Sequence, residues 1–283
     1  MTDIREIVNE IETLRPIPPV AAKILELAED INSSLAEIAD LIIHDPSLTA
    51  NVLRICNSAN FGFSRKVESV HDATTLLGLN RIVKLVLLDS LSHNLSGDQQ
   101  SYGLGEGELW RHAVLSAHVV KIMGANNGVP HNKHLVFTAA LIKDIGKVIL
   151  GRFVAFSFEK IHILVKSHGY SFNEAEKEVI GMNHEELGAL IAERWRFSEK
   201  LIYIIRNHHL SDESARDDTE TALVYLADLV CMMMGMSTGV DGLAYRFYSD
   251  VLNRMSLTEK DLQTVIAATG ESWEKLESLL NLV

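Results

Sequence analysis

The residues of this chain that could do chemistry are acids, lysines and histidines set in otherwise apolar helical sequence. Asp144 follows Lys143 directly within the apolar stretch 141–148, and Asp228 stands in the apolar segment 224–230. Desolvating an isolated carboxylate costs roughly several kcal/mol, so each aspartate needs a counter-charge or several hydrogen bonds. The ammonium group of Lys143 can supply that charge, and we expect a salt bridge between Lys143 and Asp144.

Four histidines occupy similar helical positions. His112 lies early in a predicted helix, His184 opens another, and His208 with His209 closes a third. Neutral imidazoles bind Fe, Mn or Zn, and a carboxylate can bridge two such ions. For each histidine alone, the alternative is a hydrogen-bonded core residue. Glu185 is expected to face away from His184 and to stabilise the start of its helix.

Composition limits the classes of protein. The chain has 283 residues, 47% of them hydrophobic, and a formal charge of −12. This charge argues against nucleic acid as the main partner, because phosphate binding needs clustered Lys and Arg. No apolar run reaches 18 residues and no secretory signal is evident, so we expect no membrane span. Two cysteines in apolar helical sequence suit reduced, buried thiols, and we expect a cytoplasmic location.

The spacing of apolar residues predicts the secondary structure. They recur at three- and four-residue intervals without sustained strand alternation, which predicts an all-α fold. Ser34 and Glu37 have capping-box spacing, and Asp45 before Pro46 is typical of a helix start. The strongest helices of the second half are predicted at 108–126, 133–150, 184–195, 199–208 and 219–235, with two short helices within 258–282.

A polar, glycine-rich segment divides the predicted helices into two groups. Residues 96–107 include four glycines and few apolar side chains, a composition typical of a connector. We therefore expect an N-terminal helical lobe at 1–95 and a C-terminal helical lobe at 108–283.

Four ordered motifs carry a family resemblance. They are Pro-Pro-Val at 18–20, His-Asp-Pro-Ser-Leu-Thr at 44–49, Asn-Ser-Ala-Asn-Phe at 57–61 and Val-His-Asp-Ala-Thr-Thr-Leu-Leu-Gly-Leu at 70–79. Over roughly residues 15–230 the order and spacing resemble the HDOD family, the HD-related output domains of bacterial signalling proteins. The resemblance implies an all-α, HD-domain-like fold and a role in signal output, and most members have no known catalytic activity.

The C-terminal half also resembles the HD superfamily of metal-dependent phosphohydrolases, including the HD-GYP phosphodiesterases. This resemblance implies a set of metal ligands at His112, Asp144, His184, His208, His209 and Asp228. Lys143 stands where the superfamily has the histidine of its His-Asp doublet, and an ammonium must lose its proton to bind a metal. No Gly-Tyr-Pro element follows His209, which argues against hydrolysis of cyclic dinucleotides.

Three functions therefore stay open. The first is a signal-transduction output module whose degenerate pocket is structural or ligand-sensing, with no cofactor and with signalling proteins as partners. The second is a phosphohydrolase that keeps a divalent Fe, Mn or Zn ion despite Lys143. The third is a nucleotide-sensing regulator in which Lys143 and Lys147 contact phosphate.

Overall fold

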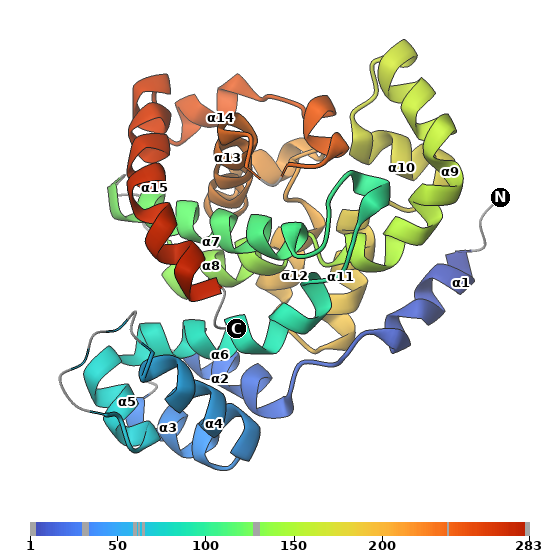
Figure 1. The fold of residues 1–283 in the computed structure, drawn as a ribbon. Helices are drawn as coiled ribbons and strands as arrows, with labels where there is room; N and C mark the ends of the chain where they lie inside the picture. The colour runs from blue at the N-terminus through green and yellow to red at the C-terminus, as the bar shows by residue number, and fades with distance from the viewer. Residues whose placement is uncertain are drawn as a thin grey trace. The chain divides into compact units, whose positions relative to one another are not determined.

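Helices dominate the described part of the chain. The structure, a computed structural model, describes residues 4–29, 34–58, 61, 63, 66–126, 131–236 and 238–280. Regular elements within these ranges are helical, apart from an isolated bridge between Gln99 and Leu104 (Figure 1). The predicted all-α fold is confirmed. None of the described helices combines the length and the apolar character needed to cross a membrane.

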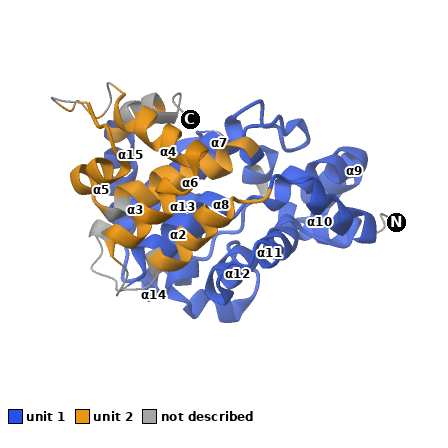
Figure 2. Cartoon of the chain, turned by 90° about the horizontal axis from the view of Figure 1, so that it is seen from below, with its two compact units in different colours: residues 1–15, 94–271 blue, residues 16–93, 272–283 orange. Residues whose placement is uncertain are grey.

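The chain forms two compact units (Figure 2). Unit 1 contains Met1–Arg15 and Asn94–Glu271, and unit 2 contains Pro16–His93 and Ser272–Val283. The two lobes predicted at 1–95 and 108–283 stay a prediction as domains. Residues 96–107 are more than a bare connector, because Tyr102 and Leu104 are buried in unit 1.

Unit 2 is built from short helices with well-defined starts. Ser34 accepts a hydrogen bond from the Glu37 amide at 3.2 Å, and the Glu37 carboxylate accepts one from the Ser34 amide at 2.8 Å. The Asp45 carboxylate accepts from the Leu48 amide at 3.0 Å, so both predicted helix starts are confirmed. Its helices are α2 (Pro19–Glu29), α3 (Leu35–Ile43), α4 (Pro46–Cys56), α5 (Val70–Leu77) and most of α6 (Leu79–Leu95).

Unit 1 contains the six histidines and aspartates that the sequence analysis named as candidate metal ligands. Helix α7 packs against α8 and α13, α9 against α10 and α11, and α12 against α8 and α11. Its elements are α1 (Ile4–Asn9), η1 (Glu10–Thr13), η2 (Gln100–Tyr102), α7 (Glu108–Asn126), α8 (Lys133–Ile142), α9 (Gly146–His168), α10 (Phe172–Ile180), α11 (His184–Arg194), α12 (Glu199–Arg206), η3 (Glu213–Asp217), α13 (Thr219–Met234), η4 (Val240–Ala244), α14 (Ser249–Arg254) and most of α15 (Glu259–Leu280).

The helix predicted at 133–150 is wrong, because the chain turns at residues 143–145 between α8 and α9. Gly146, the first residue of α9, explains why the chain can change direction at this turn. A Cβ there would lie 2.1 Å from the carbonyl oxygen of His184 and 2.8 Å from the amide nitrogen of Gly188. The backbone of α9 therefore crosses α11 at a distance that only glycine allows, and the turn places Lys143 and Asp144 near His184.

The two short helices predicted within 258–282 are also wrong. The structure has one helix, α15, which runs through Gly270. A single glycine in a helix costs about 1 kcal/mol relative to alanine, which neighbouring apolar contacts readily offset. Leu262, Val265 and Trp273 supply such contacts, since all three are buried.

Candidate functional site

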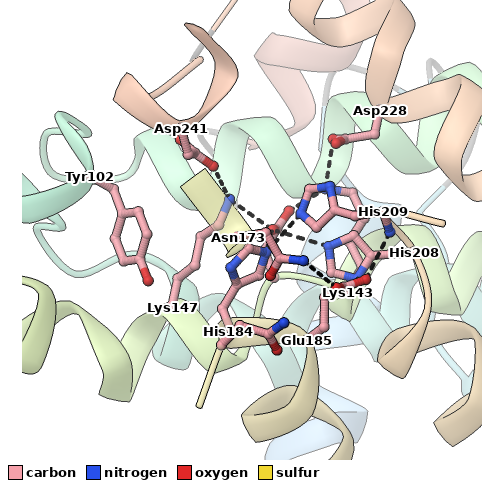
Figure 3. Close-up of polar contacts among 12 residues, drawn as sticks. Tyr102, Lys143, Lys147, Asn173, His184, Glu185, His208, His209, Asp228 and Asp241 are labelled. Atoms are coloured by element: carbon pink, nitrogen blue, oxygen red, sulfur yellow. Dashed lines mark hydrogen bonds and ion pairs between the residues drawn. The ribbon is translucent and has the colours of Figure 1, made fainter. Parts of the chain in front are cut away.

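The six side chains expected to be ligands come together at one buried place in unit 1. They come from segments far apart in the sequence, and Figure 3 shows His184, His208, His209 and Asp228 close to one another, with Lys143 and Lys147 beside them. His112 lies in α7, Asp144 between α8 and α9, His184 at the start of α11, His208 and His209 after α12, and Asp228 in α13. All are buried except His209, which is half-buried.

The first half of this site is an acid–lysine group made of Lys143, Asp144, Asp228 and His112. The Lys143 ammonium donates a hydrogen bond to Asp144 and lies 2.7 Å from Oδ1 of Asp228. Nε2 of His112 lies 2.8 Å from the same Asp228 oxygen and 3.3 Å from the Lys143 nitrogen. The salt bridge expected between Lys143 and Asp144 is present, and Lys143 also reaches a second carboxylate.

Electrostatics keep Lys143 and the two carboxylates of this group ionised. Burial alone would raise the pKa of the Asp144 and Asp228 carboxyls, but the Lys143 ammonium outweighs burial and holds both well below their usual range. Burial would lower the pKa of Lys143, yet the two carboxylates together raise it. Lys143 is therefore a permanent cation in a region shielded from water.

The second half is an imidazole group made of His184, His208 and His209, whose ligand atoms lie within 4.8 Å of one another. Nδ1 of His184 lies 2.6 Å from a Glu176 carboxylate oxygen, and Nδ1 of His208 lies 2.8 Å from the Ile205 carbonyl. Both acceptors require a proton on Nδ1, which leaves the Nε2 lone pair of a neutral ring free. Nε2 of His184 lies 2.9 Å from Nε2 of His209, whereas Nε2 of His208 is buried without a hydrogen-bond partner.

The three imidazoles differ in their pKa. Burial lowers the pKa of His208 to about 3 and that of His209 well below the usual histidine range. For His184, burial also acts to lower the pKa, but the Glu176 carboxylate more than compensates and raises it. His208 and His209 are thus neutral at physiological pH, the form in which histidine binds metals.

Lys147 is a second buried cation beside this site. Its ammonium lies 2.8 Å from Oδ1 of Asp144 and donates a 2.6 Å hydrogen bond to Asp241. Figure 3 draws the contact between Lys147 and Asp241. Burial would lower its pKa, but the two carboxylates raise it. Both Lys143 and Lys147 therefore point at carboxylates, and the predicted contact with phosphate would require these ion pairs to open.

The residues that support the histidines were not predicted from the sequence. Tyr102 donates a 2.6 Å hydrogen bond to Glu176, the carboxylate that holds His184. Glu185 does not serve the helix end as expected, because it is buried and accepts hydrogen bonds from the His209 amide and from Asn173. The position of Glu185, directly after a histidine expected to be a metal ligand, was the sequence feature that could have indicated this supporting role.

The two halves of the site fit a divalent ion differently. In the acid–lysine group, the Lys143 ammonium stands among the ligand atoms of Asp144, Asp228 and His112, so a second cation does not fit while it is there. In the imidazole group, the unpartnered Nε2 of His208 and the oriented Nε2 of His184 suit an ion such as Zn or Fe. The residues present thus fit at most a metal bound by the imidazole group.

A buried histidine–aspartate site carried by the helices of an all-α unit is the arrangement expected for an HD-related domain. The chain belongs to the HDOD family, whose domain model matches residues 14–211. The resemblance found in the sequence motifs is thereby confirmed.

Solved structures share this fold. An HDOD domain protein of unknown function from Geobacter sulfurreducens is 24% identical, with a TM-score of 0.71 over 99% of both chains. A protein from Marinobacter aquaeolei VT8, named as a candidate signal transduction protein, is 20% identical with a TM-score of 0.77, covering 97% of this chain and 60% of that one. At these identities the likeness concerns the fold alone.

A curated relative is much longer than this chain. An uncharacterized protein of Treponema pallidum (strain Nichols) is 24% identical over 196 residues, which are 68% of this chain and 37% of the relative. This chain therefore corresponds to well under half of that protein.

Proposed function

We propose that this chain is a regulatory output module of bacterial signal transduction, in which the Lys143 ammonium takes the place of a metal ion. One observation carries the proposal: Lys143 is paired with both Asp144 and Asp228 and is 1% exposed. A cation fixed there neutralises the two carboxylates without any cofactor. The site then serves as a rigid polar core or as a ligand sensor rather than as a catalyst.

The named relatives support a signalling role. The Marinobacter protein of similar fold is named as a candidate signal transduction protein, and this chain belongs to the HDOD family, whose motifs imply a role in signal output. We infer that the partners are other signalling proteins and that the module acts in the cytoplasm.

Metal analysis of wild-type protein beside Lys143→His tests this function. Both proteins are purified in the presence of Fe, Mn and Zn, and bound metal is measured by elemental analysis. We expect the variant to hold near-stoichiometric metal and the wild type far less, because the substitution exchanges an ammonium for an imidazole ligand.

Lys160→His is the matched control, since this lysine of α9 is exposed and far from the site in its own helix. It adds the same imidazole without touching the acid–lysine group, and its metal content should equal that of the wild type. Stoichiometric metal in the wild type would overturn the proposal.

A second candidate function is a phosphohydrolase with one metal held by the imidazole group. The free Nε2 of His208 favours it, as does Asp144, whose Oδ1 lies 3.8 Å from Nε2 of both His184 and His208. A metal bound there would act as a Lewis acid toward a phosphate ester. Aryl phosphates and phosphodiesters incubated with added Mn or Fe test this function, and turnover by the wild type that is lost in His208→Phe is its signature.

A further inference from the structure

Two large apolar side chains of α9 are exposed to solvent on the same side of the helix. Phe156 is 92% exposed, more than any other large hydrophobic side chain in the described ranges, and Ile163 is 54% exposed. They are seven positions apart, about two helical turns, so both project from one side of α9. Val154 and Ile161 lie on the opposite side and are buried. An exposed phenyl ring in the middle of a helix gains free energy when a second apolar surface covers it.

Two residues of opposite charge flank these apolar side chains. Glu159 and Lys160 lie between Phe156 and Ile163 in the sequence, and both are exposed. Successive residues of an α-helix are about 100° apart around its axis, so the carboxylate and the ammonium lie on opposite sides of the line from Phe156 to Ile163. These four residues, called the α9 face below, therefore form an apolar centre with one negative and one positive edge.

This arrangement of charges is complementary to a second copy of itself. When two identical helices pack in parallel about a twofold axis, each central residue meets its own copy, and the negative edge of one helix meets the positive edge of the other. Phe156 and Ile163 would each contact their own copy, and two equivalent ion pairs would join Glu159 to Lys160 of the second copy. An antiparallel pair would instead place like charges side by side, Glu159 with Glu159 and Lys160 with Lys160.

One further cation lies on this side of α9. Arg152 is one turn before Phe156, and in a parallel pair it would approach its own copy. Its guanidinium already lies 3.0 Å from a carboxylate oxygen of Glu10, which compensates its charge. A contact limited to one helix face falls short of the roughly 1,200–2,000 Å² of stable interfaces, so the association is expected to be weak.

We propose that the α9 face is a self-association surface through which two copies of this chain form a weak, parallel, symmetric dimer. Burial of Phe156 supplies most of the affinity, because exposed ion pairs are weak, and the two ion pairs select the parallel orientation. The α9 face lies outside the buried histidine–aspartate site. This inference therefore goes beyond the proposed function and does not depend on it.

Sedimentation velocity of the full chain over a concentration series measures the self-association. We expect the wild type to change from monomer to dimer in the micromolar range, as a small transient interface implies. Phe156→Ser should weaken association at least tenfold, because each dimer loses two buried phenyl rings, and it should fold because this side chain is almost fully exposed in the monomer. Phe247→Ser, the same change at an exposed phenylalanine outside α9, should leave the dissociation constant unaltered. A wild type that stays monomeric at every concentration, or undiminished association of Phe156→Ser, would overturn the proposal.

Exchange of the two charges tests the ion pairs. Glu159→Lys and Lys160→Glu each turn two attractive pairs into two repulsive ones, and each should weaken association about tenfold at low ionic strength. The double variant Glu159→Lys/Lys160→Glu restores both pairs in reversed order and should recover the wild-type dissociation constant. A double variant as weak as the single variants would refute the pairing.

Cross-linking tests the parallel orientation. Ile163→Cys should give a disulfide-linked dimer with a mild oxidant, because a parallel pair brings residue 163 next to its own copy, whereas an antiparallel pair brings it next to residue 156. The natural thiols of Cys56 and Cys231 are buried and should not react. Ser249→Cys is the control, since Ser249 is exposed and lies outside α9. Cross-linking of Ile163→Cys no greater than that of the control would exclude the proposed dimer.

Discussion

Lys143 and Asp228 form an ion pair of 2.7 Å that joins the turn between α8 and α9 to the middle of α13. Both side chains are 1% exposed, so the pair is shielded from water and salt. Such a pair contributes little compared with an apolar contact of the same shape, but removing one partner leaves an uncompensated charge. The consequence is that the acid–lysine group tolerates the loss of a member poorly.

Lys143→Met is the direct test of that consequence. Methionine keeps the length of the side chain but removes the ammonium, so that Asp228 keeps its contact with His112 and Asp144 keeps its contact with Lys147. We expect the free energy of unfolding to fall by about 3–5 kcal/mol. Urea denaturation followed by circular dichroism measures it.

The control for this prediction is Lys160→Met on the exposed surface of α9. It makes the same chemical change without burying a charge, and its effect should stay within about 0.5 kcal/mol. Equal stability of Lys143→Met and wild type would contradict the role given to the ammonium group.

Tyr102→Phe tests the link between the segment 96–107 and the histidines. The tyrosine is fully buried, and its hydroxyl donates to the Glu176 carboxylate that orients His184. Loss of this charged hydrogen bond should lower stability by about 1–3 kcal/mol. Urea denaturation checks it, with Tyr203→Phe in α12 as the control, since that ring is only half-buried. A loss no greater than that of the control would show that Glu176 does not need Tyr102.

Local rules account for what the sequence predicted about the fold. Capping at Ser34 and Asp45 depends on residues three positions apart, and apolar spacing depends on one helix at a time. The predicted helix at 108–126 coincides with α7. The turn at 143–145 escaped prediction because it depends on the close crossing of α9 over α11 at Gly146, which no local pattern encodes.

The candidate site, like the fold, was predicted from the sequence only in part. Residue types alone indicated that Asp144 needs the charge of Lys143, since a buried carboxylate requires a counter-charge. Glu176, Asp241 and Tyr102 were missed because their roles arise from contacts between distant segments. Residue type alone was also insufficient for Lys143 and Lys147. As lysines they suggested contacts with phosphate, but both are buried and paired with the Asp144 carboxylate.

Gly146→Ala tests the crossing that brings the two halves of the site together. A Cβ would meet backbone atoms of His184 and Gly188, which cannot rotate away, so one helix must move. We expect a loss of several kcal/mol, at least about 3, as in severe overpacking. Thermal unfolding measures it against Gly270→Ala in α15, where a Cβ meets nothing within 4 Å and stability should rise by about 0.5–1 kcal/mol. Similar behaviour of the two variants would refute the close approach of α9 to α11.

Asp218 gives a prediction for pH dependence away from the site. It caps α13, accepting hydrogen bonds from the Thr221 amide at 2.9 Å and hydroxyl at 2.6 Å, and it pairs with Lys200. Burial acts to raise its pKa, but the contacts with Lys200 and Thr221 outweigh burial and lower it. A carboxyl whose pKa is lower in the folded state stabilises the protein above its unfolded pKa of about 3.9, and this stability is lost as pH falls through the folded value.

Asn also caps helices, so Asp218→Asn should cost about 0.2–1 kcal/mol at pH 7 and nothing below the folded pKa. Urea denaturation of both proteins across the acid range measures this difference, with Asp98→Asn controlling for net charge. A difference that stays constant, or that grows as pH falls, would contradict the assigned direction of the shift.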